Sequence, residues 1–515
     1  IFASNIGSEH LIGLAGAGAS SGMAMAHWEI QGWMILILGW VFVPFYSRSM
    51  VYTMPEFLER RYNPQSRTIL SVISLVSYVL TKVAVTVYAG GLVFQQVFGI
   101  KELWGIDFFW IAAIGLVVLT ALYTIFGGMK SVLYTSVLQT PILLLGSLII
   151  LVLGFKELGG WDEMMRVCGA VTVNDYGDTM TNLIRSNDDA NFPWLGALIG
   201  SAIIGFWYWC TDQFIVQRVL SGKNEKEARR GTIFGAYLKL LPVFLFLIPG
   251  MIAFALHQKY IGAGGEGFLP MLANGTANAD AAFPTLVAKL LPAGVKGLVV
   301  CGILAALMSS LASLFNSSAM LFTIDFYKRF RPETPEKKLV GIGQIATVVI
   351  VILGILWIPI MRSVGDVLYT YLQDVQSVLA PGIAAAFLLG ICWKRTSAQG
   401  GMWGLIAGMI IGLTRLGAKV YYSNAGEVAD STFKYLFYDM NWLFFCGWMF
   451  LFCIIVVIVV SLATEAPTAE KIQGLVFGTA TKEQKAATRA SWDHWDIIHT
   501  VIILAITGAF YWYFW

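Results

Sequence analysis

Long runs of hydrophobic residues, separated by short polar stretches, follow one another along nearly the whole chain. Many of these runs reach the length of about 20 residues that a helix needs to cross a ~30 Å hydrocarbon core. The pattern predicts an all-α polytopic membrane protein with about 13 transmembrane segments. We expect these segments near residues 1–26, 29–50, 68–98, 106–127, 132–155, 194–218, 230–257, 284–324, 338–361, 365–392, 399–421, 440–463 and 493–515.

Composition supports the membrane interpretation. Of the 515 residues, 57% are hydrophobic and 13% charged, whereas soluble domains carry about a quarter of charged residues. The six cysteines show no paired spacing and most lie in apolar runs, so we interpret them as core residues without a disulfide framework or a metal site. The chain begins inside an apolar segment, as though an N-terminal piece were missing.

Basic residues are concentrated in four loops, and these loops orient the chain. If the segments simply alternate in direction, all four loops fall on one face, which should be cytoplasmic. The loops at 156–193 and 258–283, rich in Asp, Asn and Gly, then lie on the opposite side. The basic residues are Arg60, Arg61, Arg67, Arg218, Lys223, Lys226, Arg229, Arg230, Lys328, Arg329, Arg331, Lys337, Lys338, Lys394 and Arg395.

Two segments contain polar and glycine-rich stretches that predict interruptions. The first is interrupted at "ASNIGSEH", residues 3–10, and the sixth at "GFWYWCTDQ", residues 205–213. In transporters, interrupted helices at matching positions of two inverted repeats mark the midplane binding site, because unwound backbone offers carbonyls and amides to ions and substrates. Irregular backbone at that depth is tolerated only where it is buried in protein or lines a cavity.

Several motifs carry a family resemblance. "FASNIGSEHLIGLAGAGASSG", "TMPEFLERRY", "WYWCTDQFIVQRVLSGKN", "YLKLLPVF", "LMSSLASLFNSSAMLFTIDFYKR" and "LAPGIAAAFLLGICWKRTS" occur in this order. With them the chain resembles the sodium/glucose cotransporters of the solute:sodium symporter family. The resemblance covers essentially the whole chain, from the family's second helix onward.

The resemblance implies a leucine-transporter-like fold of two inverted five-helix repeats with peripheral helices. The first repeat would span 1–155, an extracellular loop 156–193, the second repeat 194–392 and the peripheral helices 393–515. It also implies a sodium-coupled secondary active symporter of a hexose such as glucose or galactose. Such a protein works by alternating access in the plasma membrane, or the inner membrane of a bacterium, and has no nucleic-acid partner.

The resemblance further implies a sodium site between the interrupted first helix and the eighth. Carbonyl and hydroxyl oxygens on facing helices suit a hard cation. Small residues such as Ser309 and Ser310 also let helices pack closely, and both roles can hold together. The matching positions are the carbonyls of Ala3, Ile6 and Ala306 and the hydroxyls of Ser309 and Ser310.

Positions that match the family's sugar contacts carry side chains that a hexose can use. Glu29 can accept from two vicinal hydroxyls, Asn5 and Gln373 can donate and accept, Lys239 can donate, and Trp209 offers an apolar face. The full set is Asn5, His10, Glu29, Tyr208, Trp209, Lys239 and Gln373.

Each of these residues also has a structural interpretation. Lys239 could snorkel to the membrane surface, Glu29 and His10 could simply pair with each other, and the aromatic residues at 208 and 209 could be packing residues. The constellation favours the binding interpretation. By contrast, we interpret Glu9 as a local feature with a helix-packing or water-facing role.

One position departs from the family. Many relatives have an aspartate after "YT" in the segment that follows "GGM", whereas this chain has Ser136. That carboxylate is associated in the family with a second cation or with coupling. We therefore expect one sodium ion per sugar.

Other functions remain open at this level. Gly32 and Gly205 leave room for other cargo, such as myo-inositol or another small polar solute, and a sodium-gated sugar sensor would differ from a transporter only in flux. An enzyme that uses Glu29 and His10 as an acid/base pair is disfavoured, because the sequence offers no second carboxylate dyad, metal cluster or nucleotide loop.

Overall fold

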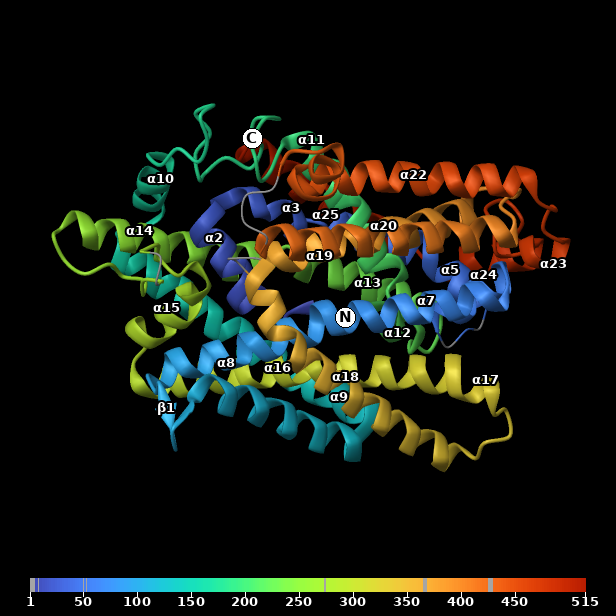
Figure 1. The fold of residues 1–515 in the computed structure, drawn as a ribbon, viewed down its shortest axis with the longest axis horizontal. Coiled ribbons are helices and arrows are strands. Elements are labelled where there is room, and N and C mark those ends of the chain that lie inside the picture. The colour runs from blue at the N-terminus through green and yellow to red at the C-terminus, as the bar shows by residue number, and fades with distance from the viewer. Residues whose placement is uncertain are drawn as a thin grey trace.

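Helices make up nearly all the regular structure of the computed structural model. The model describes residues 5–7, 9–49, 51, 53–272, 275–364, 368–424 and 429–515, without the side chains at 123, 125–136, 138–139, 360–364, 370 and 424. Most of the long helices run along one common direction (Figure 1). The short β-hairpin of β1 (Glu102–Leu103) and β2 (Ile106–Asp107) lies at one end of this bundle (Figure 1).

The N-terminal half is divided into many short helical elements, several of them π-helical. The first two predicted segments contain η1 (Glu9–Leu14), α2 (Ala15–Ser21), η2 (Gly22–Met25), α3 (Ala26–Glu29), α4 (Gly32–Ile37), η3 (Leu38–Phe42) and α5 (Val43–Ser49). They are followed by α6 (Met54–Arg61), α7 (Pro64–Ser77), η4 (Tyr78–Val83), α8 (Ala84–Phe98), α9 (Phe108–Leu158) and α10 (Trp161–Gly169).

The remaining elements include several long helices of the bundle. They begin with α11 (Trp194–Gly205), η5 (Phe206–Thr211), α12 (Gln213–Leu220), α13 (Glu225–Lys239), η6 (Val243–Leu247), α14 (Ile248–Gly262), η7 (Ala279–Ala281), α15 (Ala282–Leu290) and α16 (Ala293–Met320). They continue with η8 (Leu321–Tyr327), α17 (Lys328–Phe330), α18 (Glu336–Val364), α19 (Leu368–Cys392), α20 (Ala398–Asn424), α21 (Thr432–Lys434), η9 (Tyr435–Asp439), α22 (Trp442–Ala463), α23 (Ala469–Ile472), α24 (Lys482–Ala490) and α25 (His494–Tyr513).

Eleven helices among the described residues are long and apolar enough to cross a membrane. The predicted count of thirteen is not reproduced, because the first two segments form one span, Glu9–Ser49, and the segment at 106–127 corresponds to a shorter apolar helix, Phe108–Leu122. The 51-residue element α9 contains two predicted segments. A straight helix of that length would extend ~75 Å, far more than one crossing of a ~30 Å hydrocarbon core needs, and its apolar parts are Phe108–Leu122 and Thr140–Leu158.

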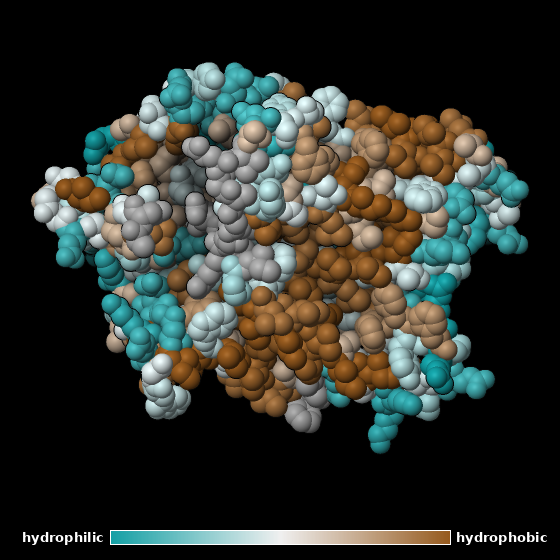
Figure 2. Space-filling view, viewed as in Figure 1, coloured by the Kyte–Doolittle hydropathy of each residue, from teal (hydrophilic) through white to brown (hydrophobic). Residues whose placement is uncertain are grey.

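The surface has the layered polarity of a membrane protein. Apolar residues form a band across the middle of the face in Figure 2, and polar residues collect toward its two ends. Three of the four predicted basic loops contact one another. Arg61 Nη2 donates to the carbonyl of Thr396 at 3.1 Å, and Arg67 Nη2 lies 2.6 Å from Asp325 Oδ1. The loops after the second, eighth and tenth predicted segments therefore share one face, and its cytoplasmic orientation stays a prediction.

Close glycine contacts hold the first helix against the seventh. A Cβ atom on Gly18 of α2 would overlap the carbonyl oxygen of Leu247, and one on Gly250 of α14 would overlap that of Ala15. Small residues allow this backbone-to-backbone approach between membrane helices. The position of the segment that precedes α2 is therefore fixed by close packing.

Both predicted interruptions are present. Ile6 and Gly7 form a bend before η1 begins at Glu9. In the sixth segment, the π-helical η5 ends at Thr211, and Asp212 is extended, with φ −76° and ψ 127°, before α12 begins. π-Helical segments are rare and frequent at functional sites.

Candidate functional site

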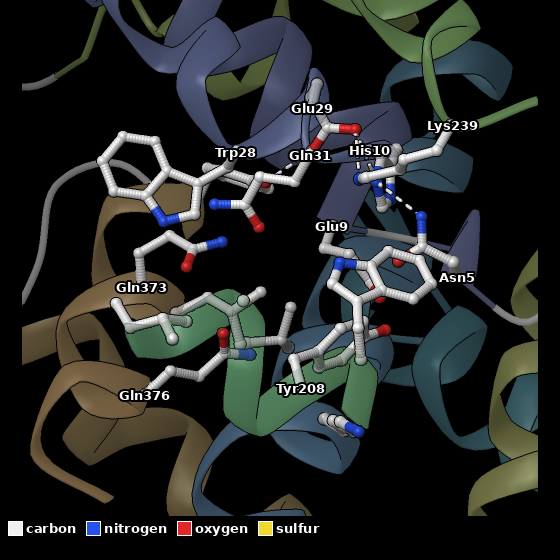
Figure 3. Close-up of a pocket in the computed structure, with 17 residues that line it drawn as sticks. Asn5, Glu9, His10, Trp28, Glu29, Gln31, Tyr208, Lys239, Gln373 and Gln376 are labelled. Carbon is white, nitrogen blue, oxygen red and sulfur yellow. Dashed lines mark hydrogen bonds and ion pairs between the residues drawn. The ribbon is translucent and has the colours of Figure 1, made fainter. Parts of the chain in front are cut away.

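A polar cavity lies between the two helix interruptions. Its walls come from η1, α3, η4, η5, α13 and α19, elements that are far apart in the sequence (Figure 3). The free space is about 40 Å³, which is room for a few water molecules. Pockets that hold small-molecule ligands usually measure ≈ 300–1,000 Å³. The cavity is thus contracted, and its polar side chains contact one another.

Glu29 is the centre of a buried hydrogen-bond network on one side of this cavity. Its carboxylate is fully buried and accepts from Lys239 Nζ at 2.6 Å and from Tyr369 Oη at 2.8 Å. His10 Nε2 lies 3.2 Å from Glu29 Oε2 and 3.3 Å from Asn5 Nδ2. The network joins the first helix, its neighbour α3, and the helices α13 and α19.

The opposite side of the cavity is formed by an indole and amides. Figure 3 shows Trp28, Gln31 and Gln373 grouped across the cavity from the Glu29 network. Trp28 Nε1 and Gln373 Oε1 are buried and have no hydrogen-bond partner among the described residues. Buried polar atoms are normally paired. A donor and an acceptor at this wall are therefore available to a polar molecule.

The interruption in the sixth helix is held by a second buried ion pair. Lys82 Nζ of η4 donates to Asp212 Oδ2 at 2.5 Å, and Tyr78 Oη donates to Asp212 Oδ1 at 2.7 Å. Asp212 also caps α12 by accepting from the amide of Phe214 at 3.3 Å. Lys82 lies 4.9 Å from the ring centroid of Tyr208, so this pair connects the helix break with the cavity wall.

All the side chains proposed from the sequence as sugar contacts line this one cavity. They are Asn5, His10, Glu29, Tyr208, Trp209, Lys239 and Gln373. The structure adds six polar or aromatic lining residues that the sequence analysis did not place there: Glu9, Trp28, Gln31, Lys82, Tyr369 and Gln376.

A signal for Lys82 was present in the sequence. A lone lysine in the apolar stretch "YVLTKVAV" is as costly in a membrane as Lys239 in its own segment. The same rule that selected Lys239 therefore selects Lys82. Trp28 and Gln376 carry no comparable signal, because their residue types are common at helix contacts and membrane interfaces.

Among the proposed ion ligands, Ile6 belongs to the first interruption and Ser310 lies beside it. Ile6, Ala306, Ser309 and Ser310 are all buried, and Ala3 lies outside the described residues. The backbone at Gly7 approaches α16 so closely that a Cβ atom there would lie 2.5 Å from Ser310 Oγ. Within the described part of the chain, Ser310 Oγ is buried without a hydrogen-bond partner. Uncharged oxygens at a helix break suit sodium.

Sequence comparison now decides the family. The model of the sodium:solute symporter family matches residues 1–408. The chain belongs to the sodium:solute symporter family. This symporter is 36% identical over 492 residues to sodium/myo-inositol cotransporter 2 of Homo sapiens, an alignment that covers 93% of the chain and 72% of the relative. It is 38% identical over 483 residues to sodium/glucose cotransporter 1 of Ovis aries, with 90% and 72% covered.

Solved structures support the fold. A Na⁺-coupled sialic acid symporter, solved in a substrate-bound outward-open state, superposes with a TM-score of 0.68 at 21% identity, covering 91% of the chain and 89% of that structure. MhsT in complex with L-phenylalanine gives a TM-score of 0.50 at 12% identity, with 90% and 96% covered. The predicted leucine-transporter-like fold is confirmed. The symporter is a multi-pass membrane protein whose coupled ion is sodium.

The Glu29 network makes a specific prediction about stability. Lys239→Ala would leave the Glu29 carboxylate buried without its lysine, which typically costs 3–5 kcal/mol. We expect a clear fall in the melting temperature of the detergent-solubilised protein, followed by intrinsic tryptophan fluorescence.

The double variant Glu29→Gln/Lys239→Ala is the matched control, because it removes both charges. It should recover most of the lost melting temperature. A double variant no more stable than Lys239→Ala would contradict the importance of the ion pair.

Proposed function

We propose that this symporter couples sodium entry to the uptake of a hexose such as glucose or galactose. The observation that supports this most directly is the cavity itself. It combines two carboxylates, two lysines and four side-chain amides with aromatic walls, directly beside an interrupted helix. Hydroxyl groups need partners that both donate and accept in fixed directions, and these side chains offer both.

Sugar binding in this proposal is an exchange of hydrogen bonds. In the contracted cavity, Glu29 bonds to Lys239 and Tyr369. Vicinal hydroxyls of a sugar would take over part of these bonds, while Gln373 Oε1 and Trp28 Nε1 gain partners that the described residues do not supply. The Glu29 bonds that break and the sugar bonds that replace them nearly balance in free energy. The new bonds to Gln373 Oε1 and Trp28 Nε1 therefore contribute most of the net affinity for sugar.

The sodium ion in this proposal binds at the carbonyls of Ala3, Ile6 and Ala306 and the hydroxyls of Ser309 and Ser310. Asn5 belongs to the same bend as Ile6 and also lines the cavity. An ion that fixes this backbone would therefore favour the conformer that presents Asn5 to the sugar. Alternating access would then move the two proposed repeats, 1–155 and 194–392, relative to each other.

A second candidate cargo is myo-inositol. Relatives named as sodium/myo-inositol cotransporters are 36% and 37% identical to this chain over 93% of its length. The amide-rich wall formed by Gln31, Gln373 and Gln376 also suits a ring whose carbons all bear hydroxyls, because each amide donates and accepts. A sodium-gated sensor would use the same cavity without transport.

Uptake into proteoliposomes separates these functions. Purified full-length chain is tested with radiolabelled glucose, and galactose, myo-inositol, sialic acid and proline serve as competitors, each with sodium and with choline. We expect sodium-dependent glucose uptake that galactose inhibits more strongly than myo-inositol. Stronger inhibition by myo-inositol would favour the second cargo, and sodium-dependent sugar binding without uptake would indicate a sensor.

Gln373→Ala tests the cavity as the sugar site. Loss of an amide hydrogen bond of ~1.5 kcal/mol predicts an apparent sugar affinity about tenfold weaker, with sodium binding in the absence of sugar little changed. Gln258→Ala, at an exposed position on α14, should transport like wild type. Wild-type affinity in Gln373→Ala would remove this residue from the site.

The proposed stoichiometry is one sodium ion per sugar, because Ser136 stands where many relatives have an aspartate. The side chain of Ser136 lies outside the described residues. A potential of ~100 mV contributes about 2.3 kcal/mol per charge, and a roughly tenfold sodium gradient adds about 1.4 kcal/mol. One ion can then support accumulation of several hundredfold, and two ions the square of that. Reversal potentials in vesicles should fit one sodium per sugar. A ratio of two would mean that another group replaces the missing aspartate.

A further inference from the structure

Glu9 lies where the proposed ion site and the cavity meet. It opens η1, and its side chain lines the cavity together with Asn5 and His10 (Figure 3). A Cβ atom built on Gly7 would lie 2.5 Å from Ser310 Oγ and 2.8 Å from Glu9 Oε2. The hydroxyl and one carboxylate oxygen therefore flank the same point. The interpretation of Glu9 as a helix-packing or water-facing residue stays a prediction, and its place in the cavity lining is compatible with a water-facing side chain.

The chemistry of the space around Ser310 Oγ and Glu9 Oε2, both close to Gly7, favours a cation. Ser310 is 5% exposed. Its Oγ atom is buried and has no hydrogen-bond partner among the described residues. The proposed ligands from Ile6, Ala306, Ser309 and Ser310 are all uncharged oxygens. A carboxylate oxygen beside them would strengthen the attraction for sodium, because charges interact strongly where water is scarce.

The same carboxylate also acts on the cavity wall. Glu9 lines the same cavity as Lys82, Tyr208 and Tyr369, and a charge acts strongly on its neighbours where water is scarce. Lys82 in turn forms the ion pair with Asp212 at the interruption of the sixth helix. Glu9 thus connects the first interruption, where the ion is proposed to bind, with the second.

We propose that Glu9 completes the sodium site by placing an anionic oxygen beside Ser310 Oγ. A bound sodium ion then neutralises part of the Glu9 charge and weakens the attraction between Glu9 and Lys82 across the cavity. This inference rests on the proposed sodium site. It makes Glu9 an affinity-determining residue for the ion, whereas Gln373 and Trp28 act on the sugar.

The test measures sodium binding without sugar. The melting temperature of the full chain in detergent is followed as sodium replaces choline at constant ionic strength, because a ligand that binds only the folded state raises it. The variants are Glu9→Gln, which removes the charge but keeps the shape, Glu9→Asp, which keeps the charge, and Ser310→Ala. Glu102→Gln, at an exposed position of β1, is the matched control.

We expect Glu9→Gln and Ser310→Ala each to raise the sodium concentration for half-maximal stabilisation by tenfold or more. Glu9→Asp should show a smaller increase and Glu102→Gln none. In choline alone, Glu9→Gln should melt at the wild-type temperature, since the change concerns the ion and not packing.

Three outcomes would overturn the inference. A wild-type sodium midpoint in Glu9→Gln beside a shifted midpoint in Ser310→Ala would reject Glu9 and leave the sodium site standing. Wild-type midpoints in both would reject the sodium site as well. A lower melting temperature in choline with an unchanged sodium midpoint would assign Glu9 to packing. If Glu9→Gln does not fold, Glu9→Ala is measured in its place, and an unchanged sodium midpoint in that variant contradicts the inference.

Discussion

Unwound backbone inside a membrane is tolerated only where other groups enclose it, and the rest of this structure follows from that constraint. The bend at Ile6 and Gly7 is enclosed by α16, and the extended Asp212 is held by Lys82 and Tyr78. Both interruptions border the same polar cavity. The two interruptions thus bring Glu29, Lys239 and the unpaired atoms of Trp28 and Gln373 to one cavity, whereas other buried charges, such as Arg229 and Arg415, do not line it.

The contracted cavity explains how this region can respond to a ligand. Glu29 is saturated by protein partners, whereas Trp28 and Gln373 on the other wall each keep one polar atom without a partner among the described residues. A solute that enters must replace hydrogen bonds between Glu29 and its protein partners. It must also bond to the unpaired atoms of Trp28 and Gln373. The free-energy cost of breaking the Glu29 bonds is offset only if the solute contacts both walls of the cavity at once. Because the two walls belong to different helices, binding is then coupled to a change in how these helices are arranged.

Much of this architecture could be predicted from the sequence. Hydrophobic runs located the membrane helices, polar and glycine-rich stretches located both interruptions, and family motifs brought together seven of the residues that line the cavity. The structure adds Glu9, Gln31 and Gln376, whose residue types do not reveal which way a helix faces. Trp28 belongs there because its ring stacks on Trp442, 5.4 Å away between centroids, a contact between segments more than 400 positions apart that no local pattern contains.

The central claim is that sodium orders the interrupted first helix and thereby prepares the sugar site. Isothermal titration of the purified protein tests it most directly, with sugar titrated at saturating and at negligible sodium, and sodium titrated with and without sugar. Thermodynamic linkage requires each ligand to change the affinity of the other by the same factor. We predict a shared factor of about tenfold or more, which corresponds to at least ~1.4 kcal/mol of coupling. A sugar affinity that is the same with and without sodium would contradict the account.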